Sequence, residues 1–134
     1  MSTLPFHKYQ ATANDFVLID QRKHKWITSA DTSVIRRLCH RRLGIGADGL
    51  ILLQEHSGYD FEMQYFNADG APGSMCGNGG RCIVAFARSL CMDKASFHFL
   101  ASDGPHEARW EEGKVAMKMK SVEKVGEVSE GYVL

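Results

Sequence analysis

The chain has 134 residues, of which 44% are apolar and 24% charged, the balance of an ordinary globular domain with a real core. Lysine plus arginine equals aspartate plus glutamate at 16 each, so the charge favours neither nucleic acid nor an anionic membrane as a partner. No apolar run approaches the length of a membrane span, and the first ten residues lack the apolar core of a signal peptide, so we expect a cytoplasmic protein.

The first elements are two strands and a helix. Residues 6–9 and 16–20 are predicted to be strands, joined by a turn of small residues. An apolar stripe of Val34, Ile35 and Leu38 predicts a helix that carries its basic residues toward its end, with Gly44 as the stop. We interpret the basic cluster as a solvated helix face whose charge matches the helix dipole, rather than as a phosphate site.

A glycine-rich loop, residues 44–49, follows that helix. It is not a dinucleotide-binding loop, because it lacks a third glycine in register and follows a helix rather than a strand. It leads into residues 50–53, a short buried strand, and residues 60–66 then alternate between apolar and polar as a half-buried strand does.

The most informative stretch is residues 66–82, FNADGAPGSMCGNGGRC. Asp69-Gly70 is typical of a tight turn, and apolar positions recur at helical spacing from Cys82 onward. Bare N–H groups of a glycine-rich helix start attract a carboxylate, and the same partial charge favours the thiolate form of Cys76. The pattern is also typical of an ordinary loop with a small buried cysteine.

The rest of the chain completes an α+β pattern. Residues 97–100 are predicted to be a strand, residues 106–120 a hairpin turning at 111–113, and residues 118–124 a charged linker. Two amphipathic helices and six to eight short strands predict an α+β fold. The cysteines at 39, 76, 82 and 91 form no C-x-x-C pair and no zinc spacing, so we expect free thiols and no metal site.

Three motifs in order carry a family resemblance. They are Asn14-Asp15-Phe16, the segment RRLGIGADGLILL from Arg41 to Leu53, and FNADG followed by MCGNGGRC. Together they resemble the N-terminal half of diaminopimelate epimerase, an enzyme of lysine and peptidoglycan-precursor synthesis that uses no cofactor. In family members the turn before Asn14 contains glycine, whereas this chain has Thr12 and Ala13, and alanine resists the positive φ such a turn needs.

The resemblance implies an architecture of two similar domains facing each other across a cleft. Each has mixed or antiparallel strands around a central helix, and each places one cysteine at the start of that helix. Only the first-domain motif is present here, so residues 1–120 are expected to form the N-terminal domain and residues 121–134 a linker and the start of a missing second domain.

The resemblance also assigns roles. It implies that Cys76 is the acid or base of this half, while Gly77 and Asn78 bind the substrate carboxylate through backbone N–H groups and Asn14 and Asn67 hold the rest of the substrate. Two thiols on opposite faces of the α-carbon exchange its proton, so an amino-acid epimerase of this kind needs no cofactor. The implied partners are a small amino acid and the second domain, and a homodimer is compatible with the sequence.

Alternative functions remain open at this point. The chain is also compatible with a noncatalytic amino-acid-binding half-domain, or with another two-cysteine racemase such as a proline racemase-like enzyme. A thiol-redox role lacks a resolving cysteine at C-x-x-C spacing. By itself the half-domain is expected to be inactive, because one base cannot serve both faces of a carbon.

Overall fold

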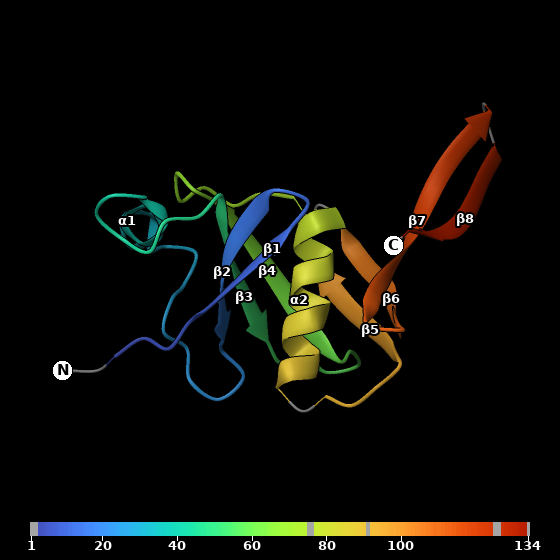
Figure 1. Cartoon of the computed structure of the whole chain (residues 1–134), viewed down its shortest axis with the longest axis horizontal. Helices are drawn as coiled ribbons and strands as arrows, with labels where there is room; N and C mark the ends of the chain where they lie inside the picture. The colour runs from blue at the N-terminus through green and yellow to red at the C-terminus, as the bar shows by residue number, and fades with distance from the viewer. Residues whose placement is uncertain (1–2, 75–76, 91, 125–126, 134) are drawn as a thin grey trace.

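The computed structural model describes residues 3–74, 77–90, 92–124 and 127–133. These residues form eight strands and two helices (Figure 1). The elements in chain order are β1 His7–Ala11, β2 Asn14–Asp20, α1 Thr32–Cys39, β3 Gly49–Gln54, β4 Phe61–Asn67, α2 Gly77–Ser89, β5 Ser96–Ala101, β6 Gly104–Glu111, β7 Lys114–Lys124 and β8 Glu127–Val133.

All the strands belong to one mixed sheet in the order β1 to β8. The β2–β3 and β4–β5 pairs are parallel, and every other neighbouring pair is antiparallel. A parallel pair needs a crossover connection, and α1 and α2 supply the two crossovers. The predicted α+β fold, with mixed strands around a central helix, is confirmed.

Helix α2 is the centre of the domain. It packs against β1, β2, β3 and β7, so strands from distant places in the sheet order meet the same helix (Figure 1). Its buried face includes Cys82, Ile83, Phe86 and Ala87, the positions expected from helical spacing. These residues form one hydrophobic core with the apolar side chains that β2 to β7 turn toward the helix.

A second core lies on the opposite face of the sheet. Along β2, Phe16 and Leu18 belong to the core around α2, whereas Val17 and Ile19 pack with Ile35 of α1. Strand β3 alternates in the same way. Because both strands are covered on both faces, each reads in the sequence as a continuous apolar run.

The turn between β1 and β2 takes the conformation that its residues resist. Thr12 and Ala13 have φ values of 48° and 70°, in the left-handed region, and Ala11 pairs directly with Asn14. Such a two-residue turn matches the twist of the flanking strands. A side chain with a Cβ costs about 1–2 kcal/mol in this region, so the sheet holds the turn against its local preference.

Two expected boundaries are wrong. Helix α1 ends at Cys39 rather than continuing through the arginines, because the ring of His40 accepts the backbone N–H groups of Arg42 and Leu43 at 3.1 Å. The charged segment 118–124, expected to be a linker, continues β7 and pairs with β8. Strand pairing uses backbone groups, so a run of charged side chains does not exclude it. The domain boundary at residue 120 stays a prediction.

Candidate active site

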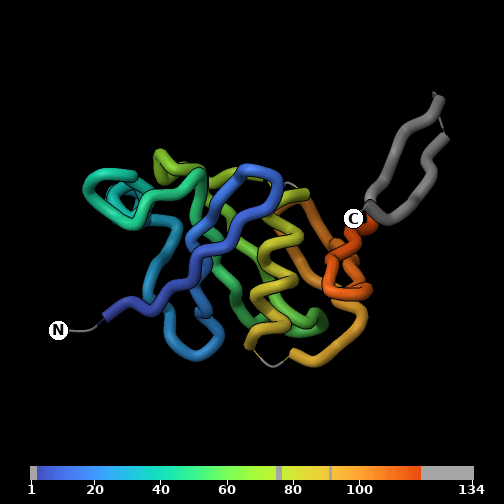
Figure 2. Tube along the Cα trace, in the orientation of Figure 1, coloured from blue at the N-terminus to red at the C-terminus, as the bar shows by residue number. Residues whose placement is uncertain are grey.

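The topology brings the expected site residues to one end of the sheet. Phe16 of β2 lies beside Gly49 of β3, and Gly49 pairs with Asn67 of β4. The start of β2, the start of β3 and the end of β4 therefore coincide. Helix α2 begins at Gly77 beside the same end, and Figure 2 shows the turn between β1 and β2 next to this helix start.

The side chains of Asn14 and Asn78 are in direct contact. Asn78 Nδ2 donates a hydrogen bond to Asn14 Oδ1 at 2.6 Å, joining residues 64 positions apart in the chain. Asn14 Nδ2 in turn donates to Asp48 Oδ2 at 3.2 Å, and the guanidinium of Arg81 donates to Asn78 Oδ1. Two of the four described candidate residues thus belong to one hydrogen-bonded chain.

A cluster of charged side chains lies next to Asn14 and includes Asp48, the residue that accepts its hydrogen bond. Arg41 makes two hydrogen bonds to the Asp15 carboxylate, at 3.0 and 2.9 Å, and Lys8 Nζ approaches the same carboxylate at 2.8 Å. The Arg41 guanidinium holds the pKa of Asp15 well below its usual range, with Lys8 assisting, although partial burial acts in the opposite direction. The same guanidinium reaches Asp48 at 3.2 Å, so the cluster connects β1, β2 and the loop before β3.

Asn67 lies apart from this hydrogen-bonded chain. It is exposed at the end of β4, and the structure describes no hydrogen bond from its side chain to Asn14 or Asn78. Its backbone begins the tight turn expected at Asp69-Gly70, where Gly70 N–H donates to Asn67 carbonyl oxygen at 2.9 Å. Gly70 has φ 91°, as this turn requires.

Tyr65 is a neighbour of the site that the sequence analysis missed. A Cβ on Gly73 would lie 2.7 Å from two carbons of its ring and 3.1 Å from Asn67 Nδ2, and a Cβ on Gly49 would lie 3.0 Å from its hydroxyl. The ring therefore occupies space that only glycine at both positions leaves open. The alternation along β4 places Tyr65 on the α2 face, but nothing local to the sequence identifies the two glycines that receive it.

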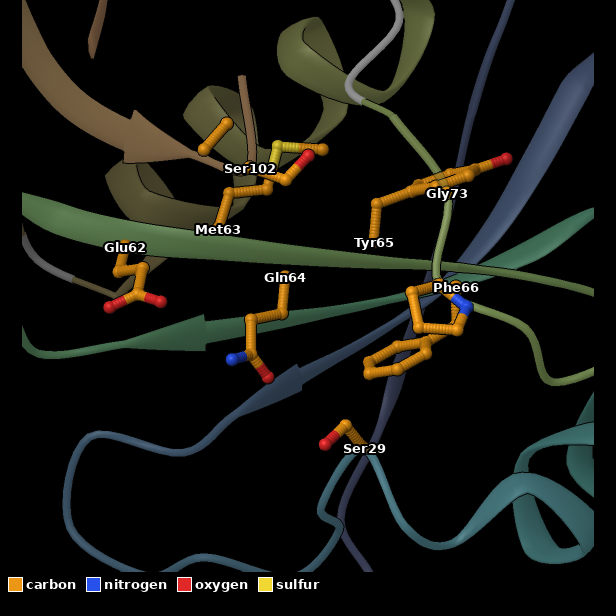
Figure 3. A pocket seen from close by; sticks show the side chains of 10 residues that line it. Ser29, Glu62, Met63, Gln64, Tyr65, Phe66, Gly73 and Ser102 are labelled. Carbon is orange, nitrogen blue, oxygen red and sulfur yellow. The ribbon is translucent and has the colours of Figure 1, made fainter. Parts of the chain in front are cut away.

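A pocket of about 240 Å³ lies along the edge of β4 between the loop at 72–73 and the end of β5 (Figure 3). Its wall includes Glu62, Met63, Gln64 and Tyr65, and Figure 3 shows the Tyr65 ring extending away from Glu62 and Met63. The pocket shares Tyr65 with the site but has none of the expected substrate-binding residues in its wall. We therefore place the candidate site at the start of α2 and not in this pocket.

The expected catalytic cysteine, Cys76, lies outside the described residues, directly before α2. Cys39 and Cys82 are buried, each about 3% exposed, and burial raises the pKa of Cys39 to about 11. Cys39 is therefore protonated at neutral pH, and both thiols are shielded from solvent. In the described ranges, no three potential metal ligands come together. Neither helix described here has the length and apolar character that a membrane span requires.

The arrangement is suited to holding a carboxylate. Gly77 and Asn78 belong to the first turn of α2, whose backbone N–H groups have no intrahelical acceptor. Among the described residues, the near contact of a Cβ on Gly77 would be Arg81 Nη1, at 3.7 Å, so these residues leave the approach to the helix start open. Orphan N–H donors, the positive end of the helix dipole and the Arg81 guanidinium all favour an anion here.

Solved structures define the class of fold. A phenazine biosynthesis PhzF family protein from Enterococcus faecalis superposes with a TM-score of 0.66 over 87% of this chain and 45% of that chain, at 12% identity. A hydroxyproline epimerase from Agrobacterium vitis superposes with a TM-score of 0.63 over 95% of this chain and 47% of that chain, at 11% identity. At such low identity these likenesses show the fold alone: this chain has the α+β fold that is found in part of each of those two proteins.

Sequence comparison identifies the family within that class. The chain belongs to the diaminopimelate epimerase family, whose sequence model matches residues 6–125. It is 47% identical over 131 residues to the diaminopimelate epimerase of Flavobacterium psychrophilum, covering 97% of this chain and 50% of the relative. It is 37% identical over 127 residues to that of Campylobacter jejuni subsp. doylei, covering 91% and 47%. The chain thus spans about half the length of the curated relatives it matches.

Proposed function

We propose that this chain is the N-terminal half of a diaminopimelate epimerase, which interconverts LL- and meso-diaminopimelate without pyridoxal phosphate. The single observation that carries the proposal is family membership over residues 6–125 at only half the length of full relatives. The contact between Asn14 and Asn78 beside the start of α2 supports it, because this contact assembles two motif residues at one site.

The proposed chemistry uses one thiol from each half. The thiolate of Cys76 removes the α-proton from one face of the amino acid, and a thiol of the second domain donates a proton to the opposite face. Cys76 ends as a thiol and its counterpart as a thiolate, so charge and protons balance. The backbone N–H groups of Gly77 and Asn78 stabilise the charge that develops on the α-carboxylate, while the side chains of Asn14 and Asn67 contact the rest of the substrate.

The missing half is therefore part of the proposal. The partner is a second domain that faces the start of α2, and the product serves lysine and peptidoglycan-precursor synthesis. A cytoplasmic location and a homodimer stay predictions.

Deuterium exchange tests the function. The 134-residue chain and a fusion of this chain to the C-terminal half of the Flavobacterium psychrophilum relative are each incubated with LL-diaminopimelate in deuterated water. We expect α-deuterium and meso product only with the fusion, and neither after Cys76→Ala. Exchange with proline instead of diaminopimelate would identify a proline racemase-like enzyme. Binding without exchange would identify a noncatalytic module, and turnover by the 134 residues alone would refute the two-domain account.

A further inference from the structure

Asn14 and Asn78 lie in the middle of a hydrogen-bonded chain whose two ends are charged. The chain runs from the Arg81 guanidinium to Asn78, from Asn78 to Asn14, and from Asn14 to the Asp48 carboxylate. Its members come from α2, the start of β2 and the loop before β3.

The two charged ends determine which way each amide faces. A guanidinium donates hydrogen bonds and cannot accept them, so the atom of Asn78 that faces Arg81 must be the oxygen. An ionised carboxylate accepts and cannot donate, so the atom of Asn14 that faces Asp48 must be the nitrogen. The remaining contact then joins the Asn78 nitrogen to the Asn14 oxygen, as the structure has it at 2.6 Å.

Asp48 is itself held in place. Its Oδ1 is bound by Arg41 at 3.2 Å, and its Oδ2 accepts the backbone N–H of Asp15 at 3.2 Å. The Asp48 backbone N–H returns a hydrogen bond to Asp15 Oδ1 at 3.0 Å. The carboxylate therefore has a defined direction before any ligand arrives.

We propose that Asp48 and Arg81 are positioning residues that orient the amides of Asn14 and Asn78 so that each presents an N–H donor to a carboxylate of the substrate. Each amide nitrogen carries two hydrogens, and one of them is donated within the hydrogen-bonded chain from Arg81 to Asp48. The second has no acceptor among the described residues, whereas each amide oxygen already accepts one hydrogen bond. The pair thus offers two N–H donors to an acceptor such as a carboxylate. The substrate part of this inference rests on the proposed function, and the orientation rests on the hydrogen bonds alone.

The kinetic test uses variants that remove the directional constraint on the two amides. Asp48→Asn replaces a group that only accepts hydrogen bonds, and Arg81→Gln replaces a group that only donates them. Each new side chain is an amide, which can do either. In the fusion with the second half, we expect kcat/KM for LL-diaminopimelate to fall about 10- to 100-fold, with KM raised and kcat lowered, because misplaced groups slow proton transfer. Arg81→Lys keeps a donor-only group and should recover most of the loss.

Matched controls lie outside the candidate site. Arg88→Gln removes another arginine of α2, one that contacts Lys94 and Trp110, and Asp60→Asn removes a carboxylate that pairs with Lys94. Both should leave kcat/KM unchanged. Equal loss in Arg81→Lys and Arg81→Gln, or normal kcat/KM in both Asp48→Asn and Arg81→Gln, would overturn the proposal.

A spectroscopic readout separates this inference from the proposed function. Side-chain amide signals of Asn14 and Asn78 are recorded by ¹⁵N NMR on the 134-residue chain, or on the fusion if the shorter chain gives a poorly dispersed spectrum. We expect Asp48→Asn to shift the Asn78 signal, and Arg81→Gln the Asn14 signal, although neither pair is in contact. If each amide signal responds only to substitution of the residue that it contacts, the proposed orientation through the hydrogen-bonded chain is wrong, even in an active enzyme. If both signals respond to both substitutions in an inactive protein, the proposed orientation stands and the proposed function fails.

Discussion

Substituting Gly77 by valine tests the proposed approach of the substrate carboxylate to the start of α2. Gly77 is the first residue of the helix, and within the part of the chain that the structure describes a Cβ there would meet Arg81 Nη1 at the ordinary contact distance of 3.7 Å. Valine is no worse than glycine within a helix, so the free energy of unfolding should change by less than about 1 kcal/mol. The variant should fold normally while its side chain fills the space above the backbone N–H groups.

The expected effect on catalysis is large. Losing one oxyanion-type donor costs about 3 kcal/mol in the transition state, and blocking the approach of the carboxylate should cost at least as much. We therefore expect kcat/KM of the fusion enzyme to fall at least about a hundredfold, while Cys76 still reacts with iodoacetamide at the wild-type rate. The measurements are steady-state epimerisation, thermal unfolding and site-resolved labelling.

A smaller substitution controls for displacement of Arg81. Gly77→Ala adds only the Cβ, which the structure accommodates, so it should give an intermediate loss. Near-normal activity of Gly77→Val would mean that the carboxylate binds elsewhere, and the role given to the start of α2 would be wrong.

Three further predictions concern the thiols, the first turn and the charge cluster. Cys76 should be alkylated by iodoacetamide faster than Cys39 and Cys82, which are buried; equal labelling by mass spectrometry would contradict the proposed thiolate. Ala13→Gly should raise the free energy of unfolding in urea by about 0.5–1 kcal/mol, because it relieves a φ of 70°; a loss of stability would show that the turn is not strained. Asp15→Asn should lower the free energy of unfolding at pH 7 by about 2 kcal/mol through lost ion pairs. Because folding lowers the pKa of Asp15 from 3.8, the stabilisation by Asp15 is complete above that pH and is lost as the pH falls toward the folded-state pKa. The difference in the free energy of unfolding between Asp15→Asn and wild type should therefore shrink below about pH 4. A difference that stays constant with pH would contradict the ion-pair account.

Much of the fold follows from patterns that are local in the sequence. The continuous apolar runs of β2 and β3 indicate strands covered on both faces, and the helical spacing after Cys82 predicts the face that α2 buries. The glycine-rich residues before the helical spacing predict a helix start near Gly77 and Asn78, and α2 begins at Gly77. These features depend on the period of the chain and the chemistry of single residues, which the sequence carries directly.

The contacts of the site were decided by the tertiary structure. Asn14 meets Asn78 only because β2 runs parallel to β3 and α2 starts at the end of the sheet where β2 and β3 begin. Arg41 belongs to a basic cluster that, read locally, is a solvated helix face, yet it is the main partner of Asp15 in the folded chain. No periodicity reports a contact between residues 26 or 64 positions apart, because such a contact depends on the register of the whole sheet.

The strained backbone of the first turn is also a consequence of the tertiary structure. Taken by itself, the Thr12-Ala13 turn should avoid positive φ, but pairing of β1 with β2 and packing of both strands on α2 outweigh a cost of a few kcal/mol. Tyr65 is similar, since its ring lies where Gly49 and Gly73 leave room, on segments that only the folded sheet brings together. The sequence by itself determined the elements and the family motifs, whereas the folded sheet determined which of their side chains meet, because only packing over the whole domain can offset local preferences.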